Sequence, residues 1–464
     1  MSTREPWQCD AGALAAAYAG RTLSPVETLA SITQRMHALQ PVLNPIVCWD
    51  ADGALAAARA SEERWQRSAP LSPLDGVPVT VKDNIPVAGL PCRWGSRLYA
   101  DHMPTRDESP VARLRAAGAV IVGKTNVPEF TLLGYTDNLL NGPTRNPWNP
   151  ALTPGGSSGG AVACVAAGIA PIALATDGGG SIRRPCSHVG IAGLKPSFGR
   201  VPRADGLPDL LPGMEVIGPI ARSVGDLMRM LAVIGPSSGA TPLPDHAGPR
   251  RIACWTSIAD GPVDPEILAR THEAIATLRA LGHTVDVRAA PDVVDRFNRD
   301  AWPVISGAGL AAVLAPHAQR LGHSAVEALL TPAMRAMWET ARTLTPARIA
   351  AAQQLVRELQ AALLAMFETC DLLLTPAAAA LPWPATETHP TRIADQEVGP
   401  RGHAVFTAFV NACGLPALAV PLAPSREGLP IGMQLVAPMG TDDALCRFGL
   451  AWEAAQPWAD RWPA

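Results

Sequence analysis

The sequence predicts an α/β protein in which one large, mixed and twisted central sheet is covered by helices on both faces. From residue 77 onward, short apolar runs alternate with longer stretches of helical periodicity, and such alternation is typical of a sheet flanked by helices. With 464 residues, of which 48% are hydrophobic, the chain can also bury a sizeable core. We expect a single domain over residues 1–464.

The predicted helices are stretches with apolar residues at helical spacing, and two of them have clear N-terminal signals. Ser24 precedes Pro25 and an apolar run, and Ser223 is followed by Asp226 at the capping-box position. The predicted helices lie at residues 10–39, divided near residue 22, and then at 51–68, 110–117, 161–168, from 223, at 264–281, 292–370 and 440–455. We treat the mostly helical stretch at 292–370 as an insert.

The predicted strands are short apolar runs bounded by polar or turn residues. They lie at residues 77–81, 119–122, 172–176, 251–255, 283–287, 371–375, 417–422 and 431–436. The first two flank a predicted helix and so predict a β-α-β unit. A stretch rich in Pro, Gly and Ser at 236–250 predicts a surface connection.

One segment of this unit has the spacing of a phosphate-binding loop, because Gly118–Thr125 reads G-x-x-x-x-G-K-T. That motif needs a loop between a strand and a helix. Here the four intervening residues, Ala119–Val122, are themselves the predicted strand, and Pro128 follows soon after. A nucleotide-binding protein is therefore only a remote alternative.

The charge pattern argues against nucleic-acid and membrane partners. The formal net charge is -3 and only 17% of the residues are charged, so no basic surface for nucleic acid or an anionic membrane is expected. The longest apolar run, Ala161–Ala175, contains Gly168 and Pro171 and is shorter than the roughly 20 residues of a membrane span. We expect a small-molecule substrate, and the sequence leaves a homodimer open.

The nine cysteines are odd in number and show no C-x-x-C spacing, and no H-E-x-x-H motif occurs. A disulfide framework and a structural zinc site are therefore not expected. The N-terminal residues carry charges and no apolar segment typical of a signal peptide. We expect a cytoplasmic protein that binds no metal.

Basic residues are distributed unevenly, because only three of the 38 lysines and arginines are lysines, namely Lys82, Lys124 and Lys195. Arginine stays protonated in proteins, whereas a buried lysine can lose its proton and act as a base. Codon bias with three remaining lysines is the alternative explanation. All three lie close in sequence to the glycine- and serine-rich stretch, which favours a role in chemistry.

Two glycine clusters within residues 153–185 each adjoin a serine. Ser157 and Ser158 lie between Gly-Gly pairs, and Ser181 follows three glycines at the end of the predicted strand 172–176. Bare N–H groups beside a serine hydroxyl are what an oxyanion hole requires. The alternative G-x-S-x-G elbow centred on Ser157 is disfavoured, because prolines occupy the place where its strand would be needed.

Several motifs in one order together resemble the amidase signature family. They are VKDN (Val81–Asn84), GKTNVPEF (Gly123–Phe130), GPTRNPWNP (Gly142–Pro150), PGGSSGG (Pro154–Gly160), TDGGGSIRRP (Thr176–Pro185), GLKPS (Gly193–Ser197), GPIARSVGDL (Gly218–Leu227), GLPA (Gly414–Ala417) and GLPIGMQL (Gly428–Leu435). Strong similarity covers about residues 71–227, the expected signature core, and 414–436.

The resemblance implies a catalytic triad and no cofactor. Ser181 would be the nucleophile, Ser157 a bridging serine after a cis peptide bond, and Lys82 the base. The N–H groups of Gly178, Gly179, Gly180 and Ser181 would form the oxyanion hole. Asp177 and Arg183 would brace this turn, Ser158 would hydrogen-bond within its own loop, and Lys124 and Lys195 would belong to the scaffold.

The resemblance also implies an acyl pocket after GKTN, with Thr131, Leu132, Leu133 and Tyr135 as candidates. These residues favour a small, largely apolar amide, an anilide, an ester or a carbamate (urethane) as substrate. The rival within the family is the glutaminase (A) subunit of a tRNA-dependent amidotransferase. The sequence departs from the family pattern at Gly178, expected to loosen the oxyanion hole, and at Arg184 and Cys186, where smaller or apolar residues are common.

Overall fold

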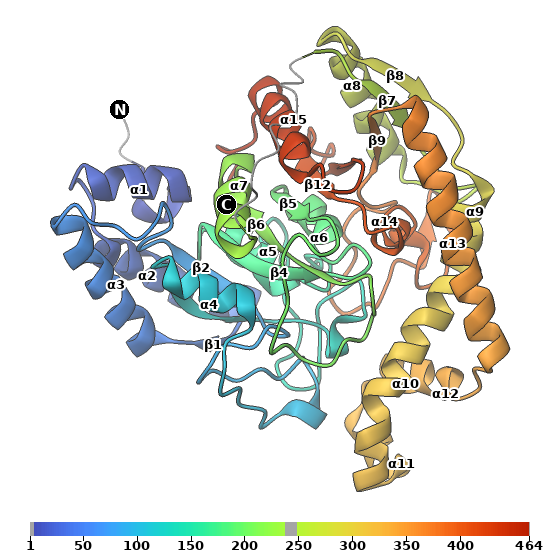
Figure 1. The fold of residues 1–464 in the computed structure, drawn as a ribbon, viewed down its shortest axis with the longest axis horizontal. Helices are drawn as coiled ribbons and strands as arrows, with labels where there is room; N and C mark the ends of the chain where they lie inside the picture. The colour runs from blue at the N-terminus through green and yellow to red at the C-terminus, as the bar shows by residue number, and fades with distance from the viewer. Residues whose placement is uncertain (1–3, 237–247, 464) are drawn as a thin grey trace.

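The computed structural model describes residues 4–236 and 248–463, and within them eleven strands form one sheet (Figure 1). The strand order is β1-β3-β2-β4-β6-β5-β12-β13-β9-β7-β8. The strands are β1 (Ile46–Trp49), β2 (Pro78–Lys82), β3 (Val120–Thr125), β4 (Ile172–Asp177), β5 (Ala192–Lys195), β6 (Val216–Ala221), β7 (Arg251–Cys254), β8 (Thr284–Val287), β9 (Leu372–Pro376), β12 (Ala417–Pro421) and β13 (Gly432–Val436).

The sheet is mixed, as predicted. Strand β2 pairs in parallel with both β3 and β4, whereas β4 and β6 are antiparallel. Strands β7 and β8 are parallel on either side of α8 (Pro265–Ala280), which confirms the predicted second β-α-β unit. The connection predicted at 236–250 falls mostly outside the described residues.

Helices cover both faces of the sheet, as the packing of β4 shows. Its side chains alternate between the two faces, as in any strand. Leu174 packs in the same core cluster as Leu227 of α7 (Val224–Ile234), on one face. Ala173 packs in the cluster of Val162 from α5 (Gly159–Ala166), on the other face. Buried layers on both faces confirm the α/β fold with flanking helices.

The other helices agree with the predicted stretches, except α6 and α14, which were not predicted. They are α1 (Ala11–Ala19), α2 (Pro25–Leu43), α3 (Ala51–Gln66), α4 (Ser109–Ala116), α6 (Arg183–Val189), α9 (Asp292–Arg296), α10 (Trp302–Leu321), α11 (His323–Leu329), α12 (Pro332–Ala341), α13 (Pro346–Thr369), α14 (Ala408–Ala412) and α15 (Asp442–Ala455). Ser24 caps α2 in a complete capping box with Glu27. Figure 1 shows α10 to α13 as a group extending beyond the sheet.

Of the two hydrogen bonds of the capping box predicted at Ser223, only one is present, so the prediction is wrong for the other. The Ser223 side chain accepts from the Asp226 N–H at 3.2 Å, as an N-cap should. The Asp226 carboxylate, however, accepts from the N–H groups of Ala11 and Gly12 at the start of α1. Asp226 therefore caps a distant helix, which no local pattern could indicate.

Strands β1, β5 and β6 were not predicted, and the middle of β6 explains why. It contains Gly218 and Pro219, residues that normally weaken a strand. A Cβ atom at Gly218 would lie 2.2 Å from the carbonyl oxygen of Leu194 in β5. The glycine is therefore required by the close approach of the neighbouring strand.

The phosphate-loop pattern at Gly118–Thr125 falls on strand β3, as expected from the sequence. Lys124 is fully buried; its Nζ donates to the carbonyl of Ile85 at 2.8 Å and lies 3.5 Å from Asp83 Oδ1. This lysine holds the segment after β2 and does not lie in a loop.

Among the described residues one helical stretch, Asp292–Leu321, is long and apolar enough to cross a membrane by length and composition alone. In the structure 56% of its most apolar window is buried against the rest of the protein. Trp302, which lies within this stretch, also reaches the site described next, so the stretch packs as a core helix.

Candidate active site

The ends of β2 and β4 bring the first site residues together. The two strands are parallel neighbours, with Val81 opposite Leu174. The carboxyl ends of parallel strands meet at one edge of the sheet, where α/β proteins bind ligands. Lys82 is the last residue of β2, and Thr176 and Asp177 end β4.

Lys82 is fully buried and its amine has three hydroxyl or carbonyl partners. Its Nζ lies 2.8 Å from the Oγ of Ser157, 2.9 Å from the Oγ1 of Thr176 and 3.1 Å from the Thr176 carbonyl oxygen. Asn84 also donates to the Thr176 hydroxyl, at 3.0 Å. No carboxylate of the described residues lies within ion-pair distance of this amine.

Burial lowers the pKa of Lys82 to about 7. The negative charges of Glu215 and Asp177 oppose this shift, and the positive charges of Arg203 and Arg184 add to it. Desolvation disfavours the charged form of an amine, so a buried lysine without an acidic partner gives up its proton near neutral pH. Lys82 can therefore accept a proton from a hydroxyl at physiological pH.

Ser157 and Ser181 come from two loops that are held side by side. The Gly156–Ser157 peptide bond is cis, as the family resemblance implied. The N–H of Ser158 donates to the carbonyl oxygen of Ser181 at 3.2 Å. Ser181 retains 7% of its exposed area, whereas Lys82 and Ser157 retain none, so Ser181 is the member of the three that a ligand can reach.

The Ser158 side chain differs from the expectation. Its hydroxyl donates to the carbonyl of Thr176 at 3.3 Å and not to a group of its own loop. Ser158 therefore connects the loop before α5 to the end of β4. The predicted hydrogen bond within its own loop is replaced by this one.

The backbone around Ser181 presents free N–H groups, with one correction. The N–H of Gly180 donates to Asp177 Oδ1 at 2.7 Å, so Gly180 is not available as an oxyanion-hole donor. The N–H groups of Gly178, Gly179 and Ser181 have no acceptor among the described residues. Gly180 has φ +111°, which favours glycine and turns the chain so that these groups stay free.

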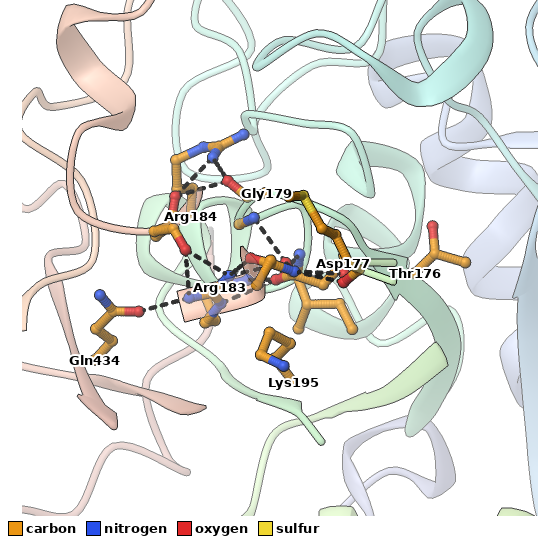
Figure 2. Close-up of polar contacts among 12 residues, drawn as sticks. Thr176, Asp177, Gly179, Arg183, Arg184, Lys195 and Gln434 are labelled. Carbon is orange, nitrogen blue, oxygen red and sulfur yellow. Dashed lines mark hydrogen bonds and ion pairs between the residues drawn. The ribbon is translucent and has the colours of Figure 1, made fainter. Parts of the chain in front are cut away.

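Asp177 and Arg183 form a buried pair that holds this turn (Figure 2). Asp177 accepts from the Nη2 and Nε of Arg183 at 2.9 and 3.0 Å and from the N–H of Ile182 at 3.0 Å. Burial alone would raise the pKa of Asp177, but the charge and hydrogen bonds of Arg183 overcome it and hold this pKa below its usual range. The carboxylate therefore stays ionised and fixes the backbone before Ser181.

Three supporting residues come from the C-terminal part of the chain. Arg183 donates to the Thr407 carbonyl at 3.2 Å, to Asn411 Oδ1 at 2.5 Å and to Gln434 Oε1 at 2.9 Å. Gln434 lies within the motif GLPIGMQL and had that signal in the sequence. Thr407 and Asn411 lie outside every motif, so only the structure reveals them.

The turn at residues 178–181, which we call the oxyanion turn because its N–H groups were predicted to form the oxyanion hole, is covered by two apolar side chains. A Cβ atom at Gly178 would lie 2.6 Å from Leu211 Cδ1, and one at Gly179 would lie 2.4 Å from the Trp302 ring. The space expected to loosen the hole at Gly178 is thus filled by Leu211. Trp302 comes from the start of α10, so the helical insert contributes to the site.

The loop at 131–135 packs directly against the serine loop. A Cβ atom at Gly156 would lie 2.4 Å from the Tyr135 carbonyl oxygen and 2.9 Å from that of Leu133. The Thr131 hydroxyl, in contrast, accepts from Trp94 Nε1 and donates to the Phe130 carbonyl. The Thr131 hydroxyl is therefore already engaged; Thr131 and Tyr135 are buried, whereas Leu132 and Leu133 are partly exposed.

The three lysines have different surroundings. Lys195 is fully buried and donates to the Pro196 carbonyl at 2.7 Å, and Lys124 holds the segment after β2. Of the three, Lys82 alone contacts a serine hydroxyl. The described residues contain no group of three or more His, Cys, Asp or Glu side chains placed to hold a metal ion.

Comparison with known proteins gives matches along nearly the whole chain. The family model described as Amidase matches residues 27–446. The chain is 34% identical to the A subunit of glutamyl-tRNA(Gln) amidotransferase from Acidothermus cellulolyticus, over 95% of this chain and 93% of that protein. It is 32% identical to an acylamidase of Rhodococcus erythropolis, over 97% and 96% of the two chains. A bacterial aryl acylamidase structure superposes with a TM-score of 0.88 at 28% identity, covering 97% of each chain.

Proposed function

The chain belongs to the amidase signature family and is an amide-hydrolysing enzyme. On this premise we propose that Ser181 is its nucleophile. Ser157 then relays the proton and Lys82 is the base. The single observation that carries the proposal is the 2.8 Å contact between the Lys82 amine and the Ser157 hydroxyl, in a buried site that brings the pKa of Lys82 to about 7.

The arrangement supports acyl transfer through a covalent intermediate. Neutral Lys82 takes the proton of Ser157, which takes that of Ser181, and the Ser181 oxygen bonds to the amide carbon. The N–H groups of Gly178, Gly179 and Ser181 stabilise the negative oxygen. The proton then returns from Lys82 through Ser157 to the leaving nitrogen as the C–N bond breaks. Water hydrolyses the acyl-enzyme by the same relay and releases the acid.

The substrate that we propose is small and largely apolar. Leu211 and Trp302 cover the oxyanion turn, and Leu132 and Leu133 lie on the neighbouring loop. Such walls suit an acyl or aryl group. Anilides are the leading choice, and esters and carbamates belong to the same proposal because the acyl-enzyme chemistry is common to all three.

The rival function is the glutaminase subunit of a tRNA-dependent amidotransferase, which is favoured by the similarity to such a protein over 95% of this chain. We propose instead an enzyme that works without accessory subunits, nucleic acid or membrane, as a monomer or a homodimer. A cytoplasmic location is part of the proposal, since all nine cysteines are free, as is usual where thiols are kept reduced. The purified chain should hydrolyse a para-nitroanilide unaided; hydrolysis of glutamine only with added subunits would favour the rival.

A covalent probe tests the assignment of the nucleophile. A fluorophosphonate should add to Ser181, as mapped by mass spectrometry, and the Ser181→Ala variant should lose both the adduct and the hydrolysis of the anilide. Ser187→Ala is the matched control, because Ser187 is also buried but lies within α6 and bonds to the Gly432 carbonyl. The control should be labelled like the unmodified enzyme, and an adduct on Ser157 would overturn the assignment.

A further inference from the structure

Arg184 is a buried arginine without an acidic partner, at the edge of the catalytic turn. Its side chain donates to the carbonyl of Gly179 and to the Thr407 hydroxyl at 2.8 Å, and its Nη2 lies 3.4 Å from the Gly156 carbonyl. The residue is 3% exposed, and its Nε has no hydrogen-bond partner. Within the described residues no carboxylate lies within 4.0 Å of its guanidinium.

The neighbouring Arg183 has the carboxylate partner that Arg184 lacks. Figure 2 shows Arg183 turned toward Asp177, whereas the guanidinium of Arg184 extends on the other side of Gly179, away from that pair. Arg183 therefore has a carboxylate of its own, while Arg184 has only neutral acceptors. It lies between the oxyanion turn and Gly156, the residue before the bridging serine.

A second arginine without an acid lies close by, on the segment before α14. The side chain of Arg401 has no hydrogen-bond or ion-pair partner among the described residues, and its guanidinium lies 4.6 Å from the centre of the Trp302 ring. Trp302 is the side chain that covers Gly179. Both arginines are thus placed around the same part of the oxyanion turn.

His403 lies near the two arginines and against the loop 131–135. Both of its ring nitrogens are buried without partners, and its Nε2 would lie 2.3 Å from a Cβ atom at Gly134, in the loop 131–135. Burial lowers the pKa of His403 well below its usual value, and the charges of Arg184 and Arg401 lower it further. The imidazole is therefore neutral and can still donate one hydrogen bond.

The two arginines keep their charges at neutral pH. Burial lowers the pKa of Arg184 to about 10, and burial together with the charge of Arg184 lowers the pKa of Arg401 to about 9. Two positive charges thus lie near each other: Arg184 is buried and Arg401 is partly exposed. The described residues place no carboxylate within 4.0 Å of either guanidinium, although the charge of Asp177 partly offsets that of Arg184. Such charges are unfavourable unless an anion compensates them, and the substrate-free site does not supply one.

We propose that Arg184 and Arg401, with His403 beside them, bind a carboxylate group of the substrate. The enzyme would then cleave small amides that carry a free carboxylate at one end, with the apolar walls of the site contacting the rest. Planar guanidinium groups bind carboxylates through paired hydrogen bonds, and the unpartnered Nε of Arg184 leaves a donor for this purpose. The inference rests on the proposed function, because it names the substrate class of the same site.

Two anilides that differ in one group test the proposal. The monoamide of succinic acid with para-nitroaniline carries the carboxylate, and the para-nitroanilide of butyric acid lacks it. The enzyme should have at least tenfold higher kcat/KM for the succinyl compound. In Arg184→Gln the kcat/KM for that compound should fall by about 30-fold or more, through KM, with a much smaller change for the butyryl compound.

Arg222→Gln is the matched control. Arg222 is also a buried arginine, but its side chain donates to the carbonyls of Ala459 and Arg461 near the C-terminus. This variant should leave the preference for the succinyl compound unchanged. If Arg184→Gln slows both anilides equally, Arg184 only holds the two loops together and the proposal is wrong.

A binding measurement separates this inference from the proposed function. Succinate should bind to the Ser181→Ala variant in a calorimetric titration, and the additional change Arg184→Gln should abolish the heat. Labelling of Ser181 without succinate binding or succinyl preference would overturn the inference and leave the nucleophile in place. Succinate binding that depends on Arg184, without any labelling of Ser181, would retain the anion site and overturn the proposed function.

Discussion

The Nζ of Lys82 lies 2.8 Å from the Oγ of Ser157, although the two residues are 75 positions apart in the chain. One ends a central strand and the other lies in the loop before α5, so their contact depends on the docking of that loop onto the sheet edge. Because both are fully buried, solvent does not compete with the proton transfer that we propose for this pair.

Replacing Lys82 should abolish the base. Lys82→Ala should lower kcat for the para-nitroanilide by about 10²–10⁴-fold, the usual contribution of a positioned base. Lys82→Arg should be equally impaired, because a guanidinium keeps its proton. Thermal melting followed by circular dichroism checks that each variant is folded. Recovery of activity in the arginine variant would show that the position needs only a positive charge.

The pH dependence of kcat/KM should report the ionisation of Lys82. The active form has the neutral amine, so kcat/KM should rise with pH through an apparent pKa of about 7. Glu215→Gln removes a negative charge that raises the pKa of Lys82, so the rise should move to lower pH. The control Glu358→Gln, on the exposed face of α13, should leave the profile in place. A shift of the Glu215 variant to higher pH would contradict the assignment.

The pair of Asp177 and Arg183 should be important for stability. Asp177→Asn leaves the fully buried Arg183 charge without compensation and should lower the free energy of unfolding by about 3–5 kcal/mol. Asp295→Asn, which breaks an exposed pair with Arg299, should cost less than about 1 kcal/mol. Urea unfolding followed by tryptophan fluorescence measures both. Equal, small effects would show that the buried pair does not hold the turn.

A side chain at Gly179 should displace Trp302. In Gly179→Ala the new Cβ atom would lie 2.4 Å from the ring, and such overpacking costs about 1–3 kcal/mol. A shifted turn should also lower kcat for the anilide by up to about 10²-fold, because the oxyanion donors move. Gly248→Ala, where no atom lies within 4 Å of the new Cβ, is the control. Partial recovery in the double variant with Trp302→Leu would confirm the steric cause.

Most elements of the fold could be predicted because their signals are local. The strand that ends at Lys82 and the helix that begins after Ser24 carry short-range patterns of burial and capping. Strand β6 could not be predicted, since Gly218 and Pro219 hide its pattern, and the close approach of β5 that requires the glycine is not a local property. The role of Asp226 was missed for the same reason, as its partners lie at the start of α1.

The site divides in the same way. The sequence by itself determined which side chains we propose for the chemistry, because Lys82, Ser157 and Ser181 lie beside glycines or at a strand end in motifs that keep their order. Tertiary structure decided which groups have free hydrogen-bonding positions. The N–H of Gly180 donates to Asp177, and Leu211 fills the space above Gly178. Arg184 has no carboxylate partner among the described residues. Burial, charge compensation and hydrogen-bond partners depend on residues far away in the chain, such as Arg183 and Gln434, which are 251 positions apart. Only the folded chain brings such groups within contact.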